Sequence, residues 1–136
     1  MKEYTVKAFT LIELLVVIVI ISIISFIISL KFYLPYKERA YLAADTLNKG
    51  SACLSDILSF CSLHSGVNFN PYNFKNCQNS TGLYGQITVI APAGRCTEDG
   101  TPPDGYEITL LSSVSDLFET KCCYKNNGIR CYIEPR

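Results

Sequence analysis

The chain has 136 residues, with 12 basic and 12 acidic side chains and a sequence pI near 6.5. This length suits one domain, and the balanced charge argues against electrostatic capture of nucleic acid as the main role. Nucleic acid stays open as a partner only through scattered basic residues: Lys75, Arg95, Lys121, Lys125 and Arg130. The sequence has one histidine, His64, and no nucleophile–base set or phosphate loop, so we expect neither an enzyme nor a cofactor.

The N-terminus is short and slightly positive, and it leads directly into an apolar segment. Lys2 and Lys7 stand against Glu3, and residues 14–30 contain no charge. A helix over residues 11–30 rises about 30 Å, which is one hydrocarbon thickness. The positive-inside rule predicts a cytoplasmic N-terminus and an exported C-terminus. Residues 30–35 offer no small-residue signal peptidase site, so we expect the segment to stay in the mature protein.

Glu13 is a carboxylate within the first turns of this apolar segment. A charge at bilayer depth costs at least a few kcal/mol, so an intramembrane carboxylate is a functional candidate that needs a partner. The nearest basic residues are Lys7 before the segment and Lys31 after it. We therefore expect the positive partner of Glu13 to come from outside the segment itself.

The helical pattern continues beyond the apolar segment, and we expect one helix over residues 9–64. Gly66 predicts its end through a left-handed cap, and Pro35 predicts a kink or a weak turn. Gly50 is expected to weaken the helix by about 1 kcal/mol relative to alanine. Apolar or small residues follow each other at alternating spacings of four and three and define the buried stripe: Tyr36, Ala40, Ala43, Leu47, Gly50, Leu54, Ile57 and Cys61. Asp45 is among the polar residues expected on the other faces.

The remainder, residues 65–136, is expected to form a loop followed by an antiparallel sheet of three to four strands. The expected strands cover residues 83–90, 106–111, 120–125 and 129–133. Packing of the helix on this sheet gives an α+β fold. The domain organisation is then a leader at residues 1–8, an apolar helix at 9–35, and a globular domain at 36–136 whose helical part ends at residue 64.

A hairpin is expected at residues 126–128, between the last two strands. A three-residue loop places Cys123 opposite Cys131 and permits a cross-strand disulfide, with Cys122 on the opposite face toward the helix. A two-residue loop shifts the register and forbids the bond between Cys123 and Cys131.

Seven cysteines follow the apolar segment and predict an oxidising compartment. Structural disulfides fit their spacing better than a metal site, and the odd count leaves one thiol free or joined to another molecule. The candidates are Cys53, Cys61, Cys77, Cys96, Cys122, Cys123 and Cys131. A second metal candidate, calcium in the acidic loop of Glu98, Asp99, Asp104 and Glu107, is less favoured than solvated turn residues.

The sequence Lys7-Ala8-Phe9-Thr10-Leu11-Ile12-Glu13-Leu14-Leu15-Val16-Val17 resembles the class III signal of type IV pilins and type II secretion pseudopilins. The resemblance implies that a prepilin peptidase cuts between Ala8 and Phe9, and that the new Phe9 amine is methylated. The family usually has Gly before the cut, whereas this chain has Ala8, which is small enough that we expect cleavage. The specific similarity covers about 20 residues, and beyond them it is architectural, a pilin fold.

The resemblance also implies a partner for Glu13, namely the Phe9 amine of a neighbouring subunit. It implies an inner-membrane precursor, a pilus or secretion assembly platform, and a homopolymer. The first interpretation is an extracellular type IV pilus subunit serving adhesion, motility or DNA uptake, favoured by the disulfides. The alternatives are a pseudopilin of a type II secretion system, and a minor tip pilin that binds a surface or DNA.

Overall fold

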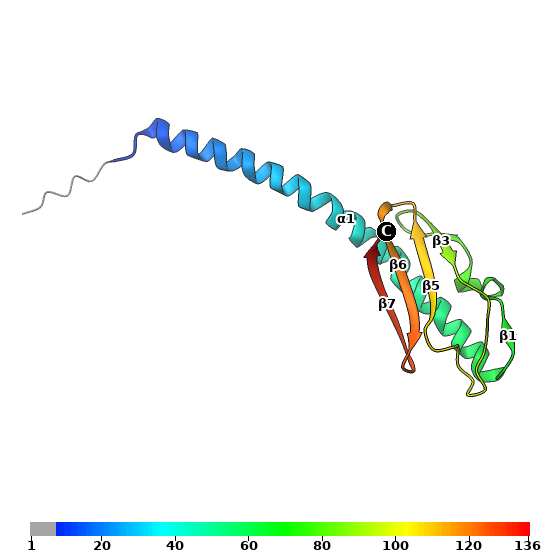
Figure 1. Ribbon diagram of the computed structural model, residues 1–136. Coiled ribbons are helices and arrows are strands. Elements are labelled where there is room, and N and C mark those ends of the chain that lie inside the picture. Colours follow the sequence, from blue (N-terminus) through cyan, green and yellow to red (C-terminus); the bar gives the residue numbers. More distant parts are fainter. Residues whose placement is uncertain (1–7) are drawn as a thin grey trace, which may run out of the picture. The chain divides into compact units, whose positions relative to one another are not determined.

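The computed structural model describes residues 8–136, and these residues divide into two compact units. The first unit ends at Pro35 and the second spans Tyr36–Arg136. One helix, α1 (Leu11–Leu63), contributes residues to both units (Figure 1). Of the expected leader at residues 1–8, all but Ala8 lies outside the described residues.

The first unit, as far as it is described, consists of α1 up to Pro35 and the residues just before the helix, and these residues have no core of their own. Every residue from 8 to 34 is exposed. Two serines in this stretch satisfy their hydroxyls within the helix: Ser22 Oγ donates to the Ile18 carbonyl at 2.8 Å, and Ser29 Oγ to the Ser25 carbonyl at 2.7 Å. This pairing lets a polar hydroxyl sit in an apolar helix without an unsatisfied group.

The second unit buries one face of α1, and this face differs in part from the expected stripe. The buried helical residues are Leu42, Asp45, Thr46, Gly50, Cys53, Leu54, Ile57 and Cys61. The expected stripe is therefore right from Gly50 to Cys61. It is wrong at Tyr36 and Ala40, which are exposed, and Asp45, expected on a polar face, is buried. Ala43 and Leu47 of the stripe are half-buried. Asp45 is buried because its carboxylate accepts backbone N–H groups from a loop of the sheet.

Five strands form the main sheet in the order β2-β3-β5-β6-β7, with every neighbouring pair antiparallel. The strands are β2 (Ser80–Thr81), β3 (Gln86–Ile90), β5 (Tyr106–Ser112), β6 (Ser115–Lys125) and β7 (Gly128–Pro135). Figure 1 shows the later turns of α1 against one face of this sheet. The expected α+β architecture, a helix packed on an antiparallel sheet, is confirmed. The sheet has one strand more than the three to four expected, since short β2 adds an edge.

The segment between α1 and the main sheet was left without a fold by the sequence, and it forms short elements. They are β1 (Asn68–Phe69) and the 3-10 turns η1 (Pro71–Asn73) and η2 (Lys75–Cys77). Strand β1 pairs with β4 (Gly94–Arg95), which lies between β3 and β5 in the chain. Asn70 caps η1, because its side-chain oxygen accepts the Tyr72 N–H at 3.2 Å. Asn and Pro therefore organise this stretch through local turns rather than through packing.

Alternation along the strands places apolar side chains toward the helix. Ile108 and Leu110 of β5 and Val89 of β3 are buried, and they pack with Leu54 and Ile57 of α1 in one core. A buried hydroxyl pair also joins helix and sheet: the Oγ1 atoms of Thr46 and Thr120 lie 2.6 Å apart.

The β6–β7 hairpin has a two-residue loop, so the expected disulfide between Cys123 and Cys131 is wrong. Lys125 pairs with Gly128, and Cys122 therefore faces Cys131 while Cys123 faces Arg130. Asn126 and Asn127 both have positive φ, 52° and 58°, as the loop of a type I′ turn requires. Asn tolerates this left-handed conformation, which moves the turn one residue ahead of Gly128.

Candidate assembly site

Glu13 lies at the start of α1 and forms a reciprocal cap with Thr10. Its Oε2 accepts the Thr10 backbone N–H at 3.0 Å, and the Glu13 N–H donates to Thr10 Oγ1 at 3.3 Å. This is a capping box, in which two N–H groups at the helix start are satisfied by side chains. A carboxylate there also lies favourably in the field of the helix dipole.

Thr10 is therefore a residue of the site that the sequence reasoning missed. The signal was present, since a threonine followed three residues later by glutamate before an apolar run is the pattern of a capping box. The cap satisfies one N–H with one carboxylate oxygen, but it brings no positive charge. Within α1's apolar segment, as far as the structure describes it, no basic side chain supplies the positive charge expected to pair with Glu13.

Phe9 and Ala8, the expected cleavage pair, precede the cap outside any helix or strand. Both are exposed, with the Phe9 side chain 83% exposed. Cleavage between Ala8 and Phe9 would place a new amine one residue before Thr10 and four before Glu13. The assignment of these residues to cleavage, methylation and assembly remains a prediction.

The apolar part of α1 meets the length and composition of a membrane span. A helix that is apolar on all sides and fully exposed requires an apolar environment, either lipid or other helices. Pro35 lies inside α1, and helical structure continues on both sides of it. The kink expected there stays a prediction.

Three disulfides hold the second unit together. Cys53 on α1 bonds to Cys77, which precedes the main sheet, and Cys61 on α1 bonds to Cys96, which follows β4, with S–S distances of 1.98 and 1.99 Å. The third joins Cys122 to Cys131 across the hairpin. Cys123 is the free cysteine among the described residues and is half-buried on the other face of β6. The first two bonds therefore tie two separate connections, one before β2 and one between β4 and β5, to the end of the helix.

Gly50 gives the hairpin disulfide room beneath the helix. A Cβ at this position would lie 2.4 Å from Cys122 Sγ and 2.9 Å from Leu110 Cδ1. The glycine that weakens the helix in isolation is thus required for its close approach to β5 and β6.

Asp45 anchors the loop between β2 and β3. Its Oδ1 accepts the Leu83 N–H at 2.8 Å, and its Oδ2 accepts the N–H groups of Tyr84 at 3.0 Å and Gly85 at 3.1 Å. The Tyr84 ring stacks on Tyr41, with centroids 4.3 Å apart. A carboxylate can be buried when each of its oxygens accepts a hydrogen bond, as both oxygens of Asp45 do here.

The outer face of the sheet carries a cluster of ion pairs around Lys121. Lys121 Nζ contacts Glu134, lies 3.5 Å from Glu119 Oε1 and 3.8 Å from Glu107 Oε1. The hydrogen bond to Glu134 and the other two carboxylates raise the pKa of Lys121 above its ordinary value. Because three glutamates surround this lysine, the face offers no local excess of positive charge for nucleic acid.

The acidic residues considered for calcium do not gather. Asp104 Oδ1 accepts the Asn126 N–H at 3.1 Å, and Glu107 belongs to the cluster around Lys121. Within residues 8–136, no group of three or more His, Cys, Asp or Glu side chains is arranged to hold a metal ion. The geometry of the loop gives no argument for calcium.

Residues 5–29 match the family model described as the prokaryotic N-terminal methylation motif. This motif is the class III signal of type IV pilins and pseudopilins, so the resemblance seen at residues 7–17 is confirmed. The motif supports a type IV pilin or pseudopilin class, and it indicates a structural subunit processed by a prepilin peptidase and assembled into pilus-like polymers. It also fits, with the apolar helix, a membrane-anchored precursor. No curated protein and no solved structure matches the chain.

Proposed function

We propose that the chain is a structural subunit of a type IV pilus, cut between Ala8 and Phe9 and polymerised through the apolar part of α1. The observation that carries the proposal is the methylation motif at the head of a helix that is apolar and exposed on all sides. Such a helix is stable in lipid before assembly and among copies of itself afterwards. The three disulfides suit a domain exposed outside the cell.

In this proposal Glu13 pairs with the methylated Phe9 amine of a neighbouring subunit. The carboxylate has two oxygens, and the cap occupies Oε2 with one N–H. An ionised carboxylate accepts about four hydrogen bonds, so the amine can be added without breaking the cap. The incoming amine supplies the missing positive charge and sets the axial register of the new subunit.

Two substitutions separate the charge of Glu13 from its role as a cap. Glu13→Gln retains a capping box, which accepts glutamine, but removes the charge. Thr10→Ala weakens the cap by about 1 kcal/mol and keeps the charge. We expect Glu13→Gln, like Glu13→Ala or Glu13→Val, to be processed normally yet yield no filaments, whereas Thr10→Ala still assembles. Filament yield is measured by immunoblot of sheared surface material, with processing read from the mass of the membrane-bound protein.

Normal filaments from Glu13→Gln would contradict the pairing, since the charge would then be dispensable. Exposed Glu98 provides a matched control, because Glu98→Gln removes the same charge from a surface turn and should change nothing. The same fractionation separates pilus from pseudopilus. Subunits in the sheared fraction support a pilus, and retention in the cell envelope supports the pseudopilin alternative.

A further inference from the structure

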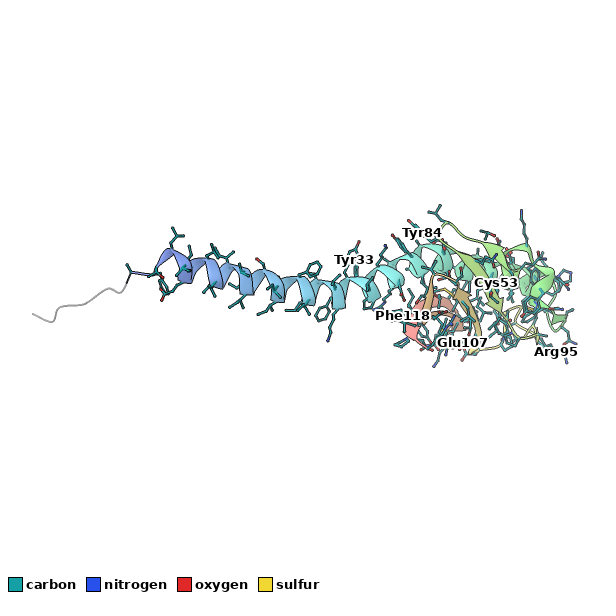
Figure 2. The ribbon with its side chains drawn as sticks, turned by 90° about the horizontal axis from the view of Figure 1, so that it is seen from above. Tyr33, Cys53, Tyr84, Arg95, Glu107 and Phe118 are labelled. Atoms are coloured by element: carbon teal, nitrogen blue, oxygen red, sulfur yellow. A yellow bond between two sulfur atoms is a disulfide. The ribbon has the colours of Figure 1, made fainter. Side chains whose placement is uncertain are left out.

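Strand β7 forms one edge of the main sheet, where it pairs with β6 on one side (Figure 1). It has eight residues, whereas β2 at the opposite edge has two. In Figure 2 the sheet lies beside the later turns of α1, with Glu107 on its outer face, away from Cys53 of the helix. A long edge strand presents a row of backbone N–H and C=O groups, which is a template for pairing with another chain.

The hairpin register determines which groups of β7 point outward. The two residues that flank a two-residue loop form a hydrogen-bonded pair, and from there hydrogen-bonded and non-hydrogen-bonded pairs alternate. Cys131 therefore forms a non-hydrogen-bonded pair with Cys122, and their Cα–Cα distance of 4.1 Å agrees with such a pair. The N–H and C=O groups of Ile129, Cys131 and Ile133 thus point away from β6. Within residues 8–136, no other backbone group bonds to them.

Two copies of β7 fit each other in an antiparallel register centred on Cys131. A two-fold axis there places Ile129 opposite Ile133 of the second copy, and each facing pair exchanges both of its N–H···O bonds. A register centred on Tyr132 would instead place Ile129 opposite Pro135, which has no N–H to donate. The register centred on Cys131 therefore satisfies all the outward groups between residues 129 and 133.

The side chains of this register are complementary on both faces of the sheet. On the face toward α1, half-buried Ile129 lies opposite half-buried Ile133 of the second copy, and the two extend the apolar layer against which Ile129 already packs. On the outer face, exposed Arg130 lies opposite exposed Tyr132 of the second copy, which favours a cation–π contact. Like charges do not face each other across the pair, so the edge matches a second copy of itself.

We propose that β7 pairs with β7 of a second copy of the chain carried by another filament, so that the contact joins two filaments laterally. This inference rests on the filament of the proposed function. A two-fold contact uses the same surface on both copies, whereas successive subunits of one helical filament meet through two different surfaces. One strand edge is smaller than the about 1,200 Å² of a stable interface, but many copies along two filaments add their contacts.

Cross-linking between filaments tests the register. Each variant also carries Cys123→Ser, because Cys123 faces Arg130 within the hairpin and would bond to a cysteine placed there. One strain makes filaments with Arg130→Cys and another makes filaments with Tyr132→Cys; the sheared filaments are mixed and oxidised with diamide. We expect about fivefold more disulfide-linked dimer than from either filament alone, since opposite residues of a non-hydrogen-bonded pair have Cα atoms about 4.5 Å apart.

The other outcomes contradict separate parts of the proposal. Dimer that forms only when both subunits are made in one cell places the contact within one filament and overturns the lateral contact. Equal dimer from either filament alone overturns the register. Absence of dimer in every mixture overturns pairing through β7. Absence of wild-type filaments from the sheared fraction overturns the proposed function, and the pairing with it.

A proline at the edge provides a second measurement. Ile133→Pro removes one outward N–H and leaves the bonds between β6 and β7 in place, while the control Ile133→Val keeps the N–H and most of the apolar side chain. Lateral association of sheared filaments is counted by electron microscopy. We expect Ile133→Pro to reduce it about tenfold, because the lost bond recurs in every paired subunit, and Ile133→Val to leave it nearly unchanged. Equal association of both variants overturns the pairing.

Discussion

The two parts of α1 differ in what surrounds them: the first is exposed and the second is packed on the sheet. From Leu11 to Leu34 the helix is exposed on every side and makes its hydrogen bonds only within itself. From Leu42 to Cys61 one face is buried on the sheet, and two cysteines bond it to the connections that hold Cys77 and Cys96. One continuous helix can thus depend on its surroundings in its first part and on contacts with its own chain in its second. Only the second part has a core that survives without lipid or neighbours.

We expect the largest effect on the stability of the second unit from removal of a disulfide that joins α1 to a loop. The bonds Cys53–Cys77 and Cys61–Cys96 close loops of 24 and 35 residues in sequence separation. Replacing either pair with serine should lower the free energy of unfolding of the second unit by about 3–4 kcal/mol. Denaturant unfolding of the full chain in micelles, followed by near-UV circular dichroism, measures this loss.

The free thiol supplies the control for that measurement, because Cys123→Ser removes no bond and should leave unfolding unchanged. Far-UV circular dichroism should show that the apolar part of α1 keeps its helicity when the second unit unfolds. Simultaneous loss of all helical signal would show that the two parts of α1 depend on each other, and it would contradict the expected independence of the first part.

Substitution of Gly50 should have a smaller effect and an instructive sign. Gly50→Ala improves intrinsic helix propensity by about 1 kcal/mol but places a methyl group against Cys122 Sγ. We expect a net destabilisation of about 1–3 kcal/mol from overpacking, measured by the same unfolding experiment. In Gly128→Ala, whose added Cβ would meet only the Lys125 carbonyl at 3.8 Å, stability should hardly change. A stabilised Gly50→Ala protein would show that the helix and hairpin can separate freely.

Lys121 should give the smallest effect, because its ion cluster is at the surface. The folded-state pKa of Lys121 is raised, so its stabilising contribution is present below the unfolded pKa of about 10.4 and is lost as pH rises through the folded value. Lys121→Met should therefore lower Tm slightly at neutral pH, and this difference should shrink in high salt and in alkali. A difference that persisted in both conditions would place the role of Lys121 in packing rather than in charge.

The sequence predicted the helix and most strands because their signals are local. Periodicity alone predicts the apolar run of the helix, its later stripe from Gly50 to Cys61, and the strands rich in β-branched residues. The end of α1 at Leu63 lies one residue before the expected end, and Gly66 has the positive φ, 72°, expected of it. The methylation motif was recognisable for the same reason, since it is contiguous.

The errors lie where distant residues decide the outcome. Burial of Asp45 depends on N–H groups about 40 residues away, which no helical periodicity can show. The hairpin register depended on the length of the loop: the sequence was compatible with three residues or two, and Asn126 and Asn127 form a two-residue loop. The two-residue loop places Cys122 beneath Gly50 and opposite Cys131. The strand register therefore determines which cysteine bonds to Cys131, and the same register packs Cys122 against the helix at Gly50.

The most direct test of the account is the mass of the N-terminus in assembled material. Filaments are sheared from cells, digested and analysed by mass spectrometry for the first peptide. We expect a chain that begins at Phe9 with a methylated amine, as the motif at residues 5–29 implies. An intact Met1 or an unmethylated internal start in assembled filaments would contradict it, because Glu13 would then lack the amine proposed as its partner.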